Sequence, residues 1–412
     1  MRFLFSLIWC LLGEVIVAQF ENLVENNNYR NRQARKPKPQ AKKGKAKLGL
    51  AAQEILDGSD RYNMWWTGPP QMNDFVPVSW SKQHTAGGNA IFSFAIQRGP
   101  DPLICDGPAC GLHLFLGSAR RSGFTGDIVV AIEANPLEEV KTALVKHGAI
   151  VYELQSDLCS KAAAGFFCGS EEERVPVSVF RYYVYEKWLA AYAPEALVLL
   201  ADYRDVVFQS NPFTYRTHEW RDYNLQVFLN FHPNMLMARS REYRNLLMGC
   251  YGPEVVRLRG SMVAVSAGAM LGSRDGMLFW TRQMTQQLQD APGRLQETRC
   301  SGPGIDKAFV NFLVYNNKVR NTCRTKLYPQ GEGSVNSLEG MHPGYPGANI
   351  TGSIKSFWHM LGDDGFVRNW NGDIAPVVHQ MHHFRDEFGA ADDKNAMWQS
   401  LASTKCLIGC AP

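Results

Sequence analysis

The sequence predicts an α/β fold in which a mostly parallel central sheet is flanked by helices. Between residues 90 and 154, apolar runs of strand length alternate with segments whose apolar residues recur at helical spacing. The predicted order is strand, helix, strand, helix, strand: Ala90–Ile96, Leu112–Arg121, Asp127–Ile132, Pro136–His147 and Ala149–Leu154. This alternation is typical of a parallel sheet with crossover helices. A continuous apolar run at Ala196–Ala201 indicates a strand buried on both faces.

The second half of the chain has a more mixed pattern. Helices are predicted at Val175–Tyr192, Arg241–Met248 and Asp275–Leu288, and further strands at Gln226–Asn230 and Met262–Val265. The turn signal Asn371-Gly372 predicts a hairpin over Phe366–Gln380. Residues 331–347 are rich in glycine and are predicted to form a flexible loop, either a plain surface loop or a lid over a bound ligand.

The ends of the chain are expected to lie outside the folded domain. Residues 1–18 join a positive start to a short apolar run, which predicts a signal peptide, either cleaved or retained as an anchor. Residues 19–60 carry nine positive charges between Arg30 and Lys47 and are predicted to be a flexible stem. The folded domain is predicted over residues 61–390, and a tail with a cysteine pair over 391–412. The chain would meet a membrane only if the first segment is retained.

The charge balance argues against a protein that binds nucleic acid. The formal net charge is +4, yet without the nine stem charges and Arg2, 33 basic residues remain against 39 acidic ones. The rest of the chain is therefore mildly acidic, whereas nucleic-acid-binding domains present a basic surface.

The cysteines favour an oxidising compartment. Nine remain beyond Cys10, and several come in close pairs, which suits local disulfides: Cys105, Cys110, Cys159, Cys168, Cys250, Cys300, Cys323, Cys406 and Cys410. An odd number leaves at least one free or bonded elsewhere, and the spacings are not those of a zinc ribbon. Asn349-Ile350-Thr351 is a glycosylation acceptor. We therefore expect the protein in the secretory pathway, in the ER or Golgi lumen or secreted.

Two carboxylates directly follow the predicted buried strand. Asp202 comes immediately after Ala196–Ala201, and Asp205 follows three residues later. Ligands of open α/β sheets bind outside the C-terminal ends of the strands. Two aspartates across a turn can face one divalent cation, which prefers carboxylate oxygens. The alternative is a structural turn in which Arg204 pairs with one of the carboxylates.

The same region carries a resemblance to a known family. Asp202-x-x-Asp205, followed by Phe208-Gln209-Ser210-Asn211-Pro212-Phe213, resembles the metal-motif region of GT-A glycosyltransferases, in particular a group with the motif Asp-x-Arg-Asp-Val-x-Phe-Gln. The resemblance spans about residues 88–388, and other segments contribute to it in order: Gly123–Asp127, Arg181–Trp188, Ser266–Gly272, Gly304–Asn311 and Val377–Gln380.

The resemblance implies a GT-A-like fold with a smaller antiparallel acceptor-side portion. It also implies transfer of a hexose or pentose from a nucleotide-sugar donor to a glycan or protein acceptor, with Mn²⁺ or Mg²⁺ as cofactor. A general base is needed only for an inverting enzyme, and both stereochemical outcomes stay open.

Roles for individual residues follow from the resemblance. Asp205 would bind the metal, Asp202 would bind the metal or the donor ribose, and His379 would be the third metal ligand. His382 and His383 are interpreted as structural.

Further residues would serve the donor. Arg181 would pair with Asp202 or with the diphosphate, and Arg204 is counted among the donor-binding residues. Gly268 would let the backbone approach the donor sugar because it has no Cβ. Asp306 would contact sugar hydroxyls or act near the reacting centre.

Two departures from the family pattern bear on donor identity and metal geometry. Tyr203-Arg204 puts two residues between the aspartates where the usual motif has one, and Lys307 follows Asp306 where glutamine is frequent. Lys307 would touch phosphate or face solvent. Two rival functions remain: a secreted carbohydrate- or matrix-binding protein with an inactive GT-A fold, and a nucleotidyltransferase, although the sequence has no Gly-rich phosphate loop ending in Lys-Ser or Lys-Thr.

Overall fold

The computed structural model describes most of the region between residues 76 and 380. The described residues are 76–85, 88–96, 108–154, 166–168, 174–231, 235–289, 300, 304–341 and 359–380. The predicted signal peptide, stem, C-terminal tail, glycosylation acceptor, His382 and His383 lie outside them. The chain divides into two compact units, residues 1–63 and 64–412, and the described residues belong to the second. Within the described part, no helix has both the length and the apolar character to cross a membrane.

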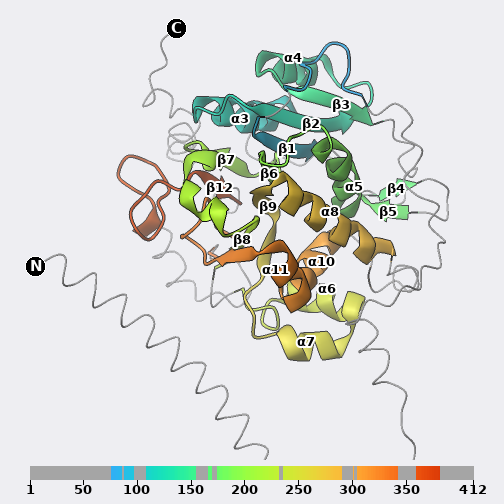
Figure 1. Ribbon diagram of the computed structural model, residues 1–412, viewed down its shortest axis with the longest axis vertical. Coiled ribbons are helices and arrows are strands. Elements are labelled where there is room, and N and C mark those ends of the chain that lie inside the picture. Colours follow the sequence, from blue (N-terminus) through green and yellow to red (C-terminus); the bar gives the residue numbers. More distant parts are fainter. Residues whose placement is uncertain are drawn as a thin grey trace, which may run out of the picture. The chain divides into compact units, whose positions relative to one another are not determined.

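A seven-stranded sheet forms the centre of the fold (Figure 1). Its order is β10-β8-β9-β6-β1-β2-β3, and β6, β1, β2 and β3 run parallel to one another. β9 is antiparallel to both β6 and β8, while β8 and β10 are parallel. The predicted α/β class with a mostly parallel sheet is confirmed. The strands are β1 (Ala90–Ala95), β2 (Asp127–Glu133), β3 (Ile150–Leu154), β6 (Leu197–Ala201), β8 (Leu225–Leu229), β9 (Val265–Ser273) and β10 (Thr325–Tyr328).

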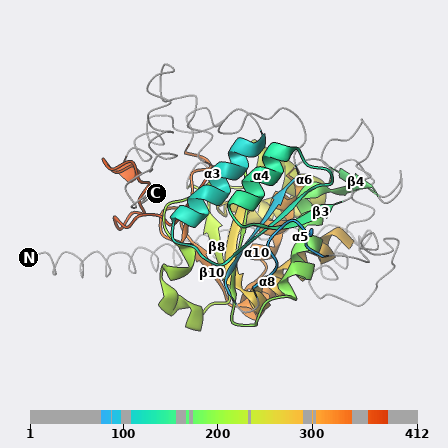
Figure 2. The same cartoon turned by 90° about the horizontal axis from the view of Figure 1, so that it is seen from above.

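Helices cover both faces of this sheet (Figures 1 and 2). Because strand side chains alternate between faces, Ile91 packs into the core under α3 and α4, whereas the neighbouring Phe92 packs into the core under α5 and α8. Two-sided burial explains why the strands read as continuous apolar runs. The helices are α3 (Pro108–Arg121), α4 (Glu138–Lys146), α5 (Val177–Leu189), α6 (Arg241–Tyr251), α7 (Pro253–Arg259), α8 (Arg274–Gln289), α10 (Ile305–Val314) and α11 (Asn317–Cys323).

The largest error of the sequence prediction concerns β9. The strand predicted at Met262–Val265 instead begins at Val265 and runs to Ser273. Its sequence, Val-Ser-Ala-Gly-Ala-Met-Leu-Gly-Ser, is rich in small residues that have little strand preference. The strand forms because β6 and β8 pair with it on its two sides, which is a tertiary effect.

A smaller sheet joins β11 (Val335–Ser337), β12 (Val377–His379) and β7 (Val206–Phe208). The flexible loop or lid predicted over residues 331–347 is wrong for its described part, because residues 333–341 are buried and include β11.

The predicted turn at Asn371-Gly372 is present, with Gly372 at a φ of 87°. A short hairpin does flank this turn, with an antiparallel bridge between Arg368 and Ile374, whereas β12 beyond it pairs with β11 and β7.

Short elements that the sequence did not indicate complete the fold. β4 (Phe166–Cys168) and β5 (Arg174–Pro176) pair with each other, so β5 occupies the start of the predicted helix. Two 3₁₀ turns, Pro212–Thr214 and Thr217–Arg221, lead from β7 toward β8.

A disulfide joins Cys250, at the end of α6, to Cys300. Its partners are 50 residues apart, so this bridge does not follow the close-pair pattern of the sequence. Cys323 is a buried free thiol, and burial raises its pKa to about 11.

We expect the C250S/C300S double variant to lose about 2–4 kcal/mol of unfolding free energy, since closing a loop of this length restricts the unfolded chain. Urea unfolding of the full chain measures the loss. As the matched control, wild type and variant are also both unfolded in a reducing agent, where their unfolding free energies should become equal. Equal urea midpoints for variant and oxidised wild type would contradict the expectation.

A histidine pair joins α3 to the end of α4. His113 Nδ1 lies 3.2 Å from His147 Nε2, and Arg120 Nε donates to the His147 carbonyl at 2.9 Å. Burial, together with the charges of His113, Lys146 and Arg121, lowers the pKa of His147 to about 4. Between pH 6.5 and 4 the unfolded chain therefore binds a proton that the folded chain excludes.

Stability should consequently fall as the pH drops through this window, by about 2 kcal/mol after allowing for partial exposure. The measurement is the difference in unfolding free energy between wild type and H147Q across pH 4–7, in which the titration of carboxylates common to both cancels. A difference that does not vary with pH would count against this role of His147.

Candidate metal and ligand site

Three potential metal ligands converge at one end of the central sheet. Asp202 directly follows β6, Asp205 directly precedes β7, and His379 is the last residue of β12. One ligand atom from each lies within 4.8 Å of the others. The Gln380 N–H donates to the Asp205 carbonyl at 2.8 Å, which holds the two chain segments together. The antiparallel pairing of β7 with β12 thus brings a histidine from residue 379 to a turn at residues 202–205.

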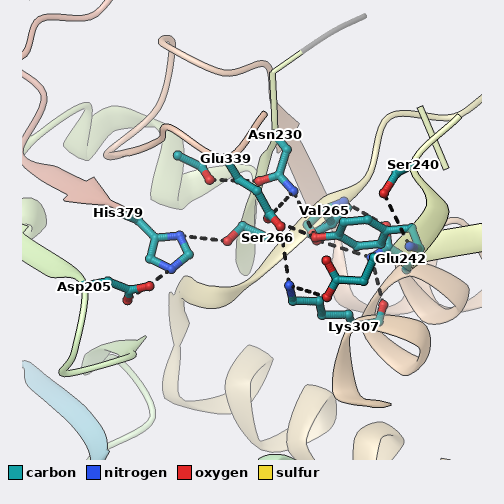
Figure 3. Close-up of polar contacts among 12 residues, drawn as sticks. Asp205, Asn230, Ser240, Glu242, Val265, Ser266, Lys307, Glu339 and His379 are labelled. Atoms are coloured by element: carbon teal, nitrogen blue, oxygen red, sulfur yellow. Dashed lines mark hydrogen bonds and ion pairs between the residues drawn. The ribbon is translucent and has the colours of Figure 1, made fainter. Parts of the chain in front are cut away.

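The His379 ring lies between Ser266 and Asp205, with one ring nitrogen facing each (Figure 3). The ring is 1% exposed, and Nδ1 lies 2.9 Å from Ser266 Oγ. The tautomer that donates from Nδ1 to Ser266 leaves a lone pair on Nε2. Within the described part of the chain, buried Nε2 makes no hydrogen bond and faces Asp205 Oδ1 at 3.4 Å. Burial disfavours the imidazolium, but the charges of Asp205 and Asp202 outweigh it and raise the pKa of His379.

Asp202 is held from behind by a buried ion-pair chain. Arg181, on α5, donates from Nη1 to Asp202 Oδ1 and from Nη2 to Asp306 Oδ2, the latter at 2.7 Å. Nη2 also donates to the Ala267 carbonyl at 3.0 Å. Burial raises the pKa of Asp306, and the charge of Arg181 opposes this shift. The guanidinium therefore fixes one oxygen of Asp202 and leaves Oδ2 to face the site.

Gly268 lies where a side chain would fill the site. A Cβ at this position would stand 2.3 Å from His379 Nε2 and 2.8 Å from Asp202 Oδ2, closer than such atoms can approach. The absence of a side chain thus keeps open the space between two of the candidate ligands. The Gly268 carbonyl also accepts from the Asp202 N–H at 2.8 Å, so the backbone itself positions the aspartate.

The three side chains could hold a divalent cation. Two carboxylates and an imidazole nitrogen form a donor set that suits a hard or borderline ion such as Mn²⁺. The buried Nε2 atom without a hydrogen bond and the space beside Gly268 fit an ion at this position. Asp202 is the most exposed of the three, with 36% of its side chain open to solvent, so a ligand would approach from its side.

A pocket lies beside the carboxylate turn. Its volume is about 340 Å³, and Tyr203, between the two aspartates, forms part of its wall. The ends of β1 and β2, residues 134–137 that follow β2, and residues of α3 and α4 form the rest of the wall, and none of the three candidate ligands lines the pocket. The pocket therefore opens at the C-terminal ends of parallel strands, where α/β sheets bind ligands.

Other residues from the sequence prediction lie close by. Arg204 is half-buried in the turn. Lys307 does not simply face solvent, because its Nζ pairs with Glu242 at 2.8 Å and with buried Glu339 at 3.4 Å; its predicted contact with phosphate stays a prediction. Asp306 is 4% exposed, and its predicted contact with a sugar stays a prediction.

Sequence reasoning missed several polar residues behind the site. Ser266 belongs to a segment that the resemblance had singled out, but its own role was not predicted. Glu339 was assigned to a flexible loop, yet Asn230 donates to its Oε2 atom at 2.7 Å (Figure 3). Tyr243 donates to the same atom at 3.0 Å. No local pattern could have found these contacts, because they join residues 96 and 109 positions apart.

Comparison with known proteins gives weak likenesses. No model of a known protein family matches the chain, and no curated protein matches it. Mouse xyloside xylosyltransferase 1 in its apo form is similar over 72% of this chain and 97% of its own, at 10% identity and a TM-score of 0.41. The galactosyltransferase LgtC, in complex with donor and acceptor sugar analogues, is similar over 76% and 95%, at 12% identity and 0.41.

A third solved structure is similar as well. The 4-diphosphocytidyl-2C-methyl-D-erythritol synthase of Anaerococcus prevotii matches over 59% of this chain and 87% of its own, at 13% identity and a TM-score of 0.34. At TM-scores below 0.5 and identities this low, the likenesses establish neither a family nor an activity for this chain.

We expect G268A to weaken Mn²⁺ binding at least tenfold, because the added methyl group would occupy the space between His379 and Asp202. Isothermal titration of the full chain with Mn²⁺ measures the affinity. G111A is the matched control, since an alanine there meets only Tyr203 Cε2, at an ordinary 3.8 Å. Unchanged affinity in G268A would show that the ion does not bind between these residues.

Proposed function

We propose that this protein is a metal-dependent glycosyltransferase that moves a hexose or pentose from a nucleotide-sugar donor to a glycan or protein acceptor. The observation that carries the proposal is the cluster of Asp202, Asp205 and His379 at the C-terminal end of a central strand, beside a pocket. The family resemblance of the sequence around Asp202-x-x-Asp205 supports the same reading.

Each group has a separate task in this proposal. Asp205 and His379 hold Mn²⁺ or Mg²⁺, and Asp202 holds the same ion or the donor ribose. Bound there, the cation supplies positive charge that neutralises the donor diphosphate and stabilises it as the leaving group. The pocket bounded by Tyr203 receives the nucleoside, since it adjoins the turn that holds the ion.

Arg181 acts through Asp202. Its guanidinium is buried and already engaged by Asp202, Asp306 and the Ala267 carbonyl. It orients the carboxylate and takes no part in contacting phosphate. Asp306 in turn holds Arg181, and Gly268 keeps the backbone close enough for the donor sugar to lie against it.

Features of the whole sequence set the expected cellular context. A signal peptide or anchor, a basic stem and an odd set of cysteines fit an enzyme of the secretory pathway, in the ER or Golgi lumen or secreted. The acceptor would then be a glycan or a protein that passes through the same compartment.

A donor screen tests the function. The full chain, produced through a secretory pathway, is incubated with a panel of nucleotide sugars and Mn²⁺, and release of the nucleotide diphosphate is followed. We expect one donor to be turned over, with EDTA abolishing the activity and added Mn²⁺ restoring it.

The variant D205N should lose at least a hundredfold of this activity, because an amide is a poorer ligand and carries no charge. D363N, which alters an exposed carboxylate, is the control and should retain full activity. Folded, Mn²⁺-binding protein that is silent with every donor would instead favour a carbohydrate- or matrix-binding protein.

A further inference from the structure

The first residues of β9, residues 265–268, extend beyond the end of its neighbour β6 at the candidate metal site. The pairing of the two strands ends at Ala201 with Ala269, followed by the bond from the Asp202 N–H to the Gly268 carbonyl. Buried backbone N–H and carbonyl groups need hydrogen-bond partners. Beyond the end of β6, side chains provide these partners on this edge of β9. Asn311, on α10, accepts from the Val265 N–H at 2.7 Å and donates to the Val265 carbonyl at 3.2 Å.

This clamp acts on the residue next to Ser266. Asn311 and Ser266 are both fully buried, and Asn311 Nδ2 also donates to the Lys307 carbonyl one turn earlier in α10, at 2.8 Å. The amide is therefore fixed to its own helix and to the β9 backbone at once. With the peptide of Val265 held, Ser266 Oγ is placed 2.9 Å from His379 Nδ1.

The same helix also reaches the other side of the site. Asp306, in the first turn of α10, holds Arg181, which holds Asp202. Lys307 pairs with Glu339. Leu338, which precedes Glu339 in the chain, donates its N–H to the His379 carbonyl at 3.0 Å. Three residues of α10 thus connect to the site: Asp306 to Asp202, Lys307 to the backbone of His379, and Asn311 to its ring.

We propose that Asn311 and Ser266 are positioning residues for His379, and that α10 is the common support of the metal ligands. Asn311 fixes the backbone of β9, Ser266 fixes the tautomer and the ring orientation, and Nε2 is thereby aimed at the ion. This inference rests on the metal site of the proposed function. Groups that hold a ligand histidine through its second nitrogen alter metal affinity without touching the metal.

The deciding experiment is Mn²⁺ binding to the full chain, measured by isothermal titration and by the electron paramagnetic resonance signal of free Mn²⁺. S266A should bind Mn²⁺ about 10–100-fold more weakly than the wild type. S118A is the matched control: it removes an equally buried hydroxyl, which accepts from the Phe208 N–H, and it should leave the affinity unchanged.

Asn311 is tested through a double-mutant cycle. N311A should weaken Mn²⁺ binding in the wild type but add little in the S266A background, because both residues act through the same link. Losses that add in full would overturn the step from Asn311 to Ser266. N311A leaves the buried N–H and carbonyl of Val265 without their side-chain partner, so thermal unfolding is recorded for each variant. If N311A does not fold, the S266A result alone decides.

The outcomes separate this inference from the function on which it rests. Two results would overturn the metal site and the inference with it: wild-type protein that binds no Mn²⁺, or a D205N variant that binds Mn²⁺ as tightly as the wild type. Wild type that binds through Asp205 while S266A matches S118A would overturn only the positioning role.

Discussion

The structure depends on one buried cation, the guanidinium of Arg181. Burial alone would lower its pKa, but Asp202 and Asp306 hold the pKa well above its usual value. Removing Arg181 would leave the buried carboxylate of Asp306 without its partner, a kind of change that costs about 3–5 kcal/mol. Through this single residue, helices α5 and α10 are tied to the end of β6 and to the β9 backbone. The arrangement of the candidate site follows from that tie.

The charges that remain after this pairing explain what the site attracts. Arg181 compensates only one of the charges on Asp202 and Asp306, and Asp205 adds another beside His379. Arg181 pairs with Asp202 and Asp306, and His379 faces Asp205. Lys307 is engaged by Glu242 and Glu339. Carboxylates gathered at one end of the sheet favour a cation, and a bound cation in turn favours an anionic ligand.

The local elements were predictable where one physical signal decides them. β1, β2, β3 and α4 each agree with the prediction within about two residues, because two-sided burial yields apolar runs and Gly148 ends the helix. β9 and β11 were missed for the opposite reason. Ser266, Gly268 and Asn336 carry no strand signal, and their segments become strands only because partners lie alongside.

The sequence by itself determined the α/β class, the strand that ends at Ala201 and the pair of aspartates after it, since these depend on residues adjacent in the chain. Only the tertiary structure decided that His379 faces Asp205, that Gly268 leaves room between His379 and Asp202, and that Asn311 bonds the Val265 backbone next to Ser266. These contacts bridge from about 45 to more than 170 residues of chain, and strand pairing and helix packing bring them about. No periodicity or spacing encodes such distances, which is why the geometry of the site had to come from the fold.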